Sequence, residues 1–173
     1  MSKRSSHIVK TGQLEGAELK IAAVYNDGLQ ESVTLVNQGT VVQPLSGWVL
    51  ASLRGQSFFL FPDDLIIYPG LTAVVHSGQQ ESRKASRLQD AWVDLLWTTD
   101  QVWNNRGDIA ILFDTNGLEI DRYSYPHERI MGSSANRRKI LLRIGDGYEI
   151  VDDTHHRAKK VTRKQNGIFV GQY

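Results

Sequence analysis

The sequence has no cysteine among its 173 residues, and this absence excludes whole classes of site. Neither a disulfide bond nor a thiolate metal site can form, so the fold depends on packing alone. Hydrophobic residues make up 40% of the chain, which is enough to build a core without a covalent cross-link. A chain without cysteine also fits the cytoplasm, and we expect that location.

Long apolar runs are missing as well. No stretch of 18 apolar residues occurs, so the sequence predicts no membrane-spanning helix. The first seven residues are basic and polar, and no apolar run of signal-peptide length follows them. Heptad patterns and repeats of solenoid period are also absent, which argues against a coiled-coil rod or a repeat array. We therefore expect a soluble chain without a membrane span.

The net charge of +1 conceals an uneven distribution. Residues 1–126 carry 10 Lys or Arg and 14 Asp or Glu, a net charge of −4, whereas residues 127–173 carry 10 and 5, a net charge of +5. The chain is thus an acidic body followed by a basic extension. We divide it into a flexible lead-in (1–17), a body (18–126) and a basic C-terminal extension with a hairpin (127–173).

Short apolar segments separated by turn residues recur along the body, which is typical of an all-β sandwich. Trp48 is expected in the core, and the first strand is expected to place Leu19, Ile21, Ala23 and Tyr25 on one face. The segment 57–61 is apolar on both faces, so we expect it at the centre of its sheet. Strands are predicted at 18–25, 31–37, 48–53, 57–61, 65–68, 71–76 and 93–97.

Two hairpins are predicted in the second half of the chain. From Gly107 to Tyr125 the pattern indicates two strands joined by a tight turn, because Asp114, Asn116 and Gly117 suit turn conformations. A further hairpin is predicted at 140–151. Because an isolated hairpin is only marginally stable in water, we expect it to pair with the sandwich or with another chain.

Six segments of the body form an ordered set: Glu31–Asn37, Leu45–Leu50, Phe59–Pro62, Tyr68–Gly70, Trp103–Asp108 and Leu112–Gly117. In this order they resemble the lamin tail domain, an immunoglobulin-like module of nuclear lamins that also occurs in bacterial and archaeal proteins. The resemblance covers residues 18–125 and indicates a stand-alone copy of the prokaryotic type. It implies an immunoglobulin-like β-sandwich and a small binding or structural module. The polar segment 77–92 and the C-terminal hairpin depart from the family pattern.

The first functional hypothesis is a non-catalytic module that binds a protein partner, or itself, through sheet edges and the C-terminal hairpin. Its basis is that sheet edges and a lone apolar hairpin both need cover. The sequence contains no nucleophile elbow, phosphate-binding loop or zinc motif, so we expect neither an enzyme nor a cofactor. The acidic pairs at 63–64 and 152–153 are interpreted as solvated turns. His155 and His156 leave a divalent-ion site open as an alternative.

Clusters of basic residues support a second hypothesis, contact with the phosphates of a nucleic acid. A solvated tail is the alternative interpretation of the same residues. The candidates are Arg137, Arg138, Lys139, Arg157, Lys159, Lys160, Arg163 and Lys164.

Tryptophans in or beside predicted loops support a third hypothesis, carbohydrate binding on an aromatic platform. The candidates are Trp92, Trp97 and Trp103. Packing of these rings within the loops is the alternative.

Overall fold

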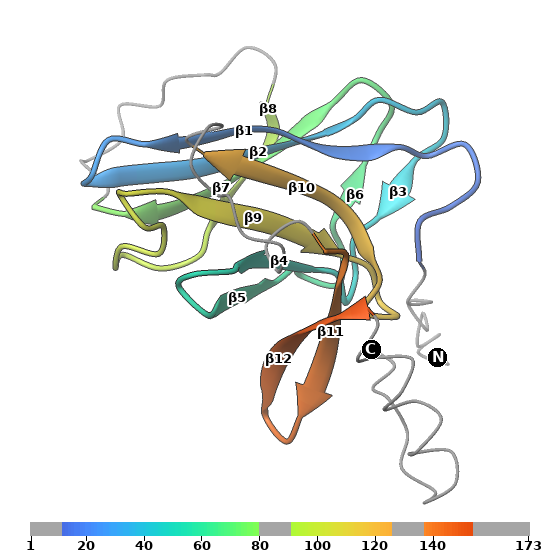
Figure 1. Cartoon of the computed structure of the whole chain (residues 1–173). Coiled ribbons are helices and arrows are strands. Elements are labelled where there is room, and N and C mark those ends of the chain that lie inside the picture. The colour runs from blue at the N-terminus through green and yellow to red at the C-terminus, as the bar shows by residue number, and fades with distance from the viewer. Residues whose placement is uncertain (1–11, 80–90, 126–136, 154–173) are drawn as a thin grey trace, which may run out of the picture.

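The structure, a computed structural model, describes residues 12–79, 91–125 and 137–153. Within these ranges the chain forms twelve β-strands, most of them in two four-stranded sheets packed face to face (Figure 1). The predicted all-β, immunoglobulin-like sandwich is therefore confirmed. Among the described residues we find no helix that is long and apolar enough to cross a membrane.

The first sheet contains β1 (Leu19–Asn26), β2 (Gln30–Asn37), β7 (Thr72–Gly78) and β8 (Ala91–Leu96). They lie in the order β1-β2-β7-β8. The first three strands pair antiparallel, whereas β8 runs parallel to β7. Because a tight turn cannot join parallel neighbours, a long connection is required, and residues 79–90 separate these two strands.

The second sheet contains β4 (Val49–Ser52), β5 (Ser57–Leu60), β9 (Asp108–Phe113) and β10 (Glu119–Tyr125). Their order is β10-β9-β4-β5, with antiparallel pairing throughout. Two further strands, β3 (Gln43–Pro44) and β6 (Ile66–Ile67), form a short sheet of their own. The sequence did not predict β3, because two residues are too few to show an alternating pattern.

The main core lies between the two sheets, and β4 contributes to it with one face only. Trp48 and Leu50 are buried in this core, as the sequence predicted for Trp48. Val49 and Ala51 are equally buried, but they belong to a second apolar cluster on the opposite face of the sheet. The second sheet is therefore apolar on both faces.

The predicted alternation in β1 is wrong beyond Ile21. The pairing with β2 shifts between Ile21 and Ala23, which is a β-bulge. Because the bulge inserts one extra residue, Val24 turns to the core, whereas Ala23 and Tyr25 are exposed. The alternation of apolar and polar residues in a sequence does not predict where a β-bulge interrupts the strand.

The prediction of a central position for the segment 57–61 is also wrong, since β5 is an edge strand. Its two apolar faces have a different cause. Phe59 turns to the core and contacts Phe61 and Trp97, whereas Phe58 turns to the other face and contacts Tyr148 of the C-terminal hairpin. An edge strand that lies between two buried layers thus has the same sequence pattern as a central strand.

The C-terminal hairpin consists of β11 (Lys139–Ile144) and β12 (Gly147–Asp152), and it packs on the outer face of the second sheet (Figure 1). The sequence predicted that this hairpin packs on the sandwich or on another chain, and in the structure it packs on the sandwich of the same chain. Leu141 is its central contact, because the side chain is buried and its amide donates to the Gly117 carbonyl at 2.9 Å. The apolar face that it covers consists of Val49, Ala51, Ile109, Ile111 and Phe113.

Gly117 allows this close approach. Its φ is +74°, and a Cβ at this position would collide with the carbonyl group of Leu141. Only glycine tolerates both the left-handed conformation and the contact. The predicted turn residue is therefore also a docking residue for the hairpin.

Residues 12–17, which the sequence analysis placed in the lead-in, contact the sandwich. The amide of Leu14 donates to the side-chain carbonyl of Gln43 at 2.7 Å, and the Gln43 amide group donates to the Gly12 carbonyl at 3.1 Å. Ala17 belongs to the main core. The remainder of the predicted lead-in, residues 1–11, lies outside the described residues.

Replacing the central contact of the hairpin should be costly. We expect Leu141→Ala to lower the free energy of unfolding by about 2–5 kcal/mol, because it leaves a cavity between the hairpin and the sheet. Ile144→Ala removes a half-exposed side chain at the tip of the same hairpin and should change stability by no more than about 0.5 kcal/mol. Urea denaturation measures both. Equal effects of the two substitutions would contradict the docked arrangement.

Candidate functional site

The two lateral sides of the sandwich differ in how they are closed. On one side β1 lies beside β10, with extensive contact between the two strands (Figure 1). On the other side β5 approaches the end of β8 through an aromatic contact, in which the ring centroids of Phe59 and Trp97 are 5.7 Å apart. These two arrangements decide whether the edges of β1, β10 and β5 are open to another strand.

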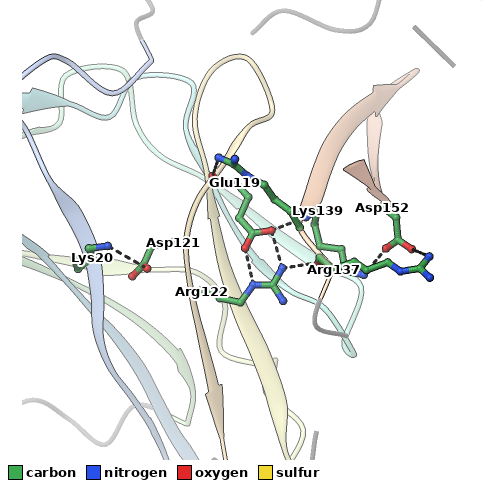
Figure 2. A network of polar contacts seen from close by, with 8 residues as sticks. Lys20, Glu119, Asp121, Arg122, Arg137, Lys139 and Asp152 are labelled. Atoms are coloured by element: carbon green, nitrogen blue, oxygen red, sulfur yellow. Dashed lines mark hydrogen bonds and ion pairs between the residues drawn. The ribbon is translucent and has the colours of Figure 1, made fainter. Parts of the chain in front are cut away.

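Charged side chains and bulges close the side formed by β1 and β10. A carboxylate oxygen of Asp121 in β10 accepts a hydrogen bond from the amide of Ile21 at 2.7 Å, and the other lies 3.7 Å from the Lys20 ammonium (Figure 2). The pairing of β1 and that of β10 each contain a β-bulge. Charges and bulges are the usual protection of sheet edges against another strand.

The edge of β5 has neither form of protection. Its four residues include no charge and no proline, and its pairing with β4 is regular. The amide of Phe61 donates to the Trp48 carbonyl at 3.0 Å. Because hydrogen-bonding groups alternate along a strand, the backbone N–H and C=O groups of Phe58 and Leu60 point away from β4. No strand of the described sheets lies on that side, and the Leu60 side chain is 52% exposed.

Aromatic rings flank this open edge on both faces of the sheet. On the outer face the ring of Tyr148 lies 5.3 Å from that of Phe58, and burial raises the pKa of the Tyr148 hydroxyl. On the inner face Trp97 lies against Phe59. An extended polypeptide along β5 would thus find backbone hydrogen-bonding groups at the edge and apolar contacts on either side.

A buried carboxylate, that of Glu31 in β2, positions the loop that carries the inner aromatic residues. It accepts hydrogen bonds from the Ser77 hydroxyl at 2.6 Å, from the Val102 amide at 2.8 Å and from the Trp103 amide at 3.1 Å. Sequence reasoning missed this role. The signal was available, because Glu31 has the same strand parity as the inward-facing residues Val33 and Leu35.

Asp108 organises the neighbouring turn in a similar way. Its carboxylate accepts hydrogen bonds from the Ser52 hydroxyl at 2.6 Å and from the Arg54 amide at 2.9 Å, and its side chain is fully buried. Both acidic residues come from segments that the sequence analysis singled out. Their chemistry is structural, since each satisfies backbone donors that would otherwise be buried without a partner.

The two candidate tryptophans whose side chains the structure describes, Trp97 and Trp103, do not form an exposed platform. Trp103 is only 3% exposed, and its ring meets that of Trp97 edge to face at 5.7 Å. Trp97 is partly buried against the main core. The side chain of Trp92 lies outside the described residues. The geometry of the two described rings favours the alternative of loop packing, and carbohydrate binding stays a prediction.

The first three candidate phosphate contacts have partners within the chain. The Lys139 ammonium is buried and lies 2.5 Å from a carboxylate oxygen of Asp152, which lowers the pKa of Asp152. Arg137 lies 3.4 Å from the other oxygen of the same carboxylate, and Arg138 donates to the Glu119 carbonyl at 3.1 Å. The cations of Lys139 and Arg137 therefore pair within the hairpin segment, and that of Arg138 joins the segment to β10 (Figure 2).

Glu119 is the centre of this polar network. Its carboxylate accepts two hydrogen bonds from the Arg122 guanidinium, at 2.5 and 2.7 Å, and one from the Lys139 amide at 2.5 Å. Arg122 in turn donates to the Arg137 carbonyl at 2.8 Å. The network joins the start of β10 to the start of β11, beside the apolar contact made by Leu141.

The remaining basic candidates, Arg157, Lys159, Lys160, Arg163 and Lys164, lie outside the described residues, as do His155 and His156. The described hairpin segment 137–153 carries four Lys or Arg and four Asp or Glu, so its formal charge is zero. In the part of the chain that the structure describes, no three His, Cys, Asp or Glu side chains gather in a way that could hold a metal ion.

The sequence matches a known protein family over about two thirds of its length. A family model described as Lamin Tail Domain matches residues 13–127. No curated protein matches the sequence significantly. The matched range contains both four-stranded sheets, the loop anchors Glu31 and Asp108, and the open edge of β5, whereas the docked hairpin lies beyond it.

Loss of the buried carboxylate of Glu31 should destabilise the loop and the fold. We expect Glu31→Ala to lower the free energy of unfolding by about 3 kcal/mol, because two buried amides and a hydroxyl lose their acceptor. Glu18→Ala, at an exposed position, should change it by no more than about 0.5 kcal/mol. Urea titration followed by tryptophan fluorescence measures both. Similar stabilities for the two variants would show that Glu31 is not an anchor.

Proposed function

Because the chain belongs to the lamin tail domain family, we propose that it is a non-catalytic module that binds another polypeptide through the open edge of β5. The observation that carries this proposal is the contrast between the two sides of the sandwich. Asp121 and two bulges close one side, whereas Phe58 and Leu60 leave backbone donors and acceptors free on the other.

An added strand is the form of ligand that suits such an edge. Main-chain hydrogen bonds supply affinity, and contacts with alternate side chains supply specificity. A strand beside β5 would place alternate side chains next to Tyr148 on the outer face and next to Trp97 on the inner face. The family membership supports the same class of function, since it indicates an immunoglobulin-like interaction domain.

The hairpin has a supporting part in this proposal. The sequence predicted that the hairpin takes part in binding directly, but its inner face is already buried against the sheet. It contributes Tyr148, which forms the outer wall of the edge. The partner is then either a second copy of the chain, paired edge to edge, or a different protein that presents an extended segment.

A charge placed on the edge should prevent binding. We expect Leu60→Lys to weaken association at least about tenfold, because a lysine at an open edge discourages strand addition. Ile144→Lys is the matched control, because Ile144 is 51% exposed and lies at the tip of the hairpin, away from β5. Light scattering at several concentrations measures self-association.

If the wild-type chain is monomeric, tagged wild-type and variant chains can be compared as baits in a cell lysate. A protein that binds the wild-type and Ile144→Lys chains but not the Leu60→Lys chain is the expected result. A monomeric chain whose captured proteins all bind Leu60→Lys equally well would refute the proposal.

A specific observation about charge favours nucleic-acid binding as a second candidate function. Segment 127–136 carries one acidic and one basic residue, and segment 137–153 is neutral, so the excess of +5 in the extension lies entirely within residues 154–173. A dense basic segment of this kind is suited to the phosphate backbone. The hairpin cations Arg137 and Arg138, which have partners within the chain, would contribute less.

Neutralising the segment tests this second candidate. The five cations from Arg157 to Lys164 are changed to glutamine, and binding to duplex DNA is titrated at low and moderate salt. We expect affinity at low salt to fall at least about tenfold and the salt dependence to weaken, because fewer counterions are released. Arg137→Gln with Arg138→Gln is the control. Absence of binding by the unmodified chain at low salt would exclude the hypothesis.

A further inference from the structure

We propose that the segment 163–170 of this chain, here called the tail segment, adds to β5 as an antiparallel strand. Its apolar triplet Ile168-Phe169-Val170 would cover the open edge, and its two cations would lie near the acidic pair that follows β5. The pairing itself does not depend on an external partner. The pairing would also make the tail segment compete with the partner for the edge of β5. This consequence rests on the proposed function.

The last described residues of the chain lie near the end of the second sheet at which Leu60 is found. The final strand places Asp152 against Lys139, whose amide is bonded to Glu119. Glu119 lies in a row of paired residues that crosses the sheet through Phe113 and Val49 and ends at Leu60. This row spans three strand spacings, about 15 Å. The ten residues from 154 to 163 can extend about 30 Å, so the tail segment can reach β5 within the same chain.

The direction of approach determines the orientation of the strand. A segment that arrives at the Leu60 end must run toward Ser57, which is antiparallel to β5. With Phe169 opposite Phe59, each step forward along the tail corresponds to one step back along β5. Ile168 then lies opposite Leu60, and Val170 opposite Phe58, the two residues whose backbone groups are open.

Side-chain parity agrees with this register. Residues directly opposite each other in an antiparallel pair lie on the same face of the sheet. Ile168 would therefore cover the exposed side chain of Leu60 on the outer face, and Val170 would lie near Phe58 and Tyr148. Phe169 would face inward, beside the ring of Trp97 that already contacts Phe59.

Charge complementarity supports the same direction of approach. Arg163 and Lys164 precede the apolar triplet, and in this orientation they would arrive on the side where the chain leaves β5 and turns through Asp63 and Asp64. Asp63 accepts a hydrogen bond from the Ser46 hydroxyl at 2.8 Å, and among the described residues neither Asp63 nor Asp64 has an ion-pair partner. The tail would thus supply cations to an acidic turn at the entrance of the open edge. A tethered segment competes effectively with an external strand, because its effective concentration is in the millimolar range.

Amide hydrogen exchange tests this pairing in the isolated protein. We expect the amides of Phe58 and Leu60 to exchange about tenfold more slowly in the full chain than in a chain ending at Asp153. The amide of Phe61, which is bonded to Trp48, is the internal control and should be equally protected in both chains. If the shortened chain fails to fold, Ile168→Asp in the full chain replaces it and should accelerate exchange in the same way.

A charge exchange tests the placement of the tail cations beside the acidic turn. Asp64→Lys and Lys164→Asp should each reduce the protection of Leu60, and the double variant should restore it. Equal exchange in the full and shortened chains would overturn the proposal. Protection that increases with protein concentration would also overturn it, because a second copy would then supply the strand. The proposed function has a different refuting result, which is partner binding that Leu60→Lys leaves unchanged.

Discussion

A sheet that is apolar on both faces must be covered twice, and the rest of this structure depends on that constraint. Leu50 of β4 and Trp48, which precedes this strand, are covered by the opposite sheet of the sandwich, whereas Val49 and Ala51 are covered by the C-terminal hairpin. Without the hairpin, the side chains of the second cluster would face water. The same contact also stabilises the hairpin, because two strands alone bury too little surface to be stable.

Polar residues complete this arrangement by acting as anchors. Glu31 and Asp108 are buried carboxylates that accept hydrogen bonds from loop backbone, and Glu119 connects the second sheet to the hairpin. Each satisfies donors that burial would otherwise leave without a partner. These three acidic residues therefore hold loops and hairpin in place, in a frame that leaves the edge of β5 without a neighbouring strand among the described residues.

The edges of the two sheets show how function can be placed on such a frame. Where β1 meets β10, Asp121 and two bulges occupy the positions that another strand would need. The edge of β5 has no such device, yet rings lie on both of its faces. Natural proteins generally protect an open apolar edge, so an unprotected one is expected to receive a strand.

Local spacing in the sequence was sufficient to predict the family, the turn around Gly117 and every described strand except β3. These features depend on alternation, turn chemistry and segment order, which neighbours along the chain determine. The sequence also determined that the hairpin needs a partner, because its strands are too apolar to remain alone. The tertiary structure decided the rest. The bulge in β1, the edge position of β5, the burial of Trp103 and the internal pairing of Lys139 all result from contacts between distant segments. A pattern shows that a side chain will be buried, but only the packed fold shows what buries it.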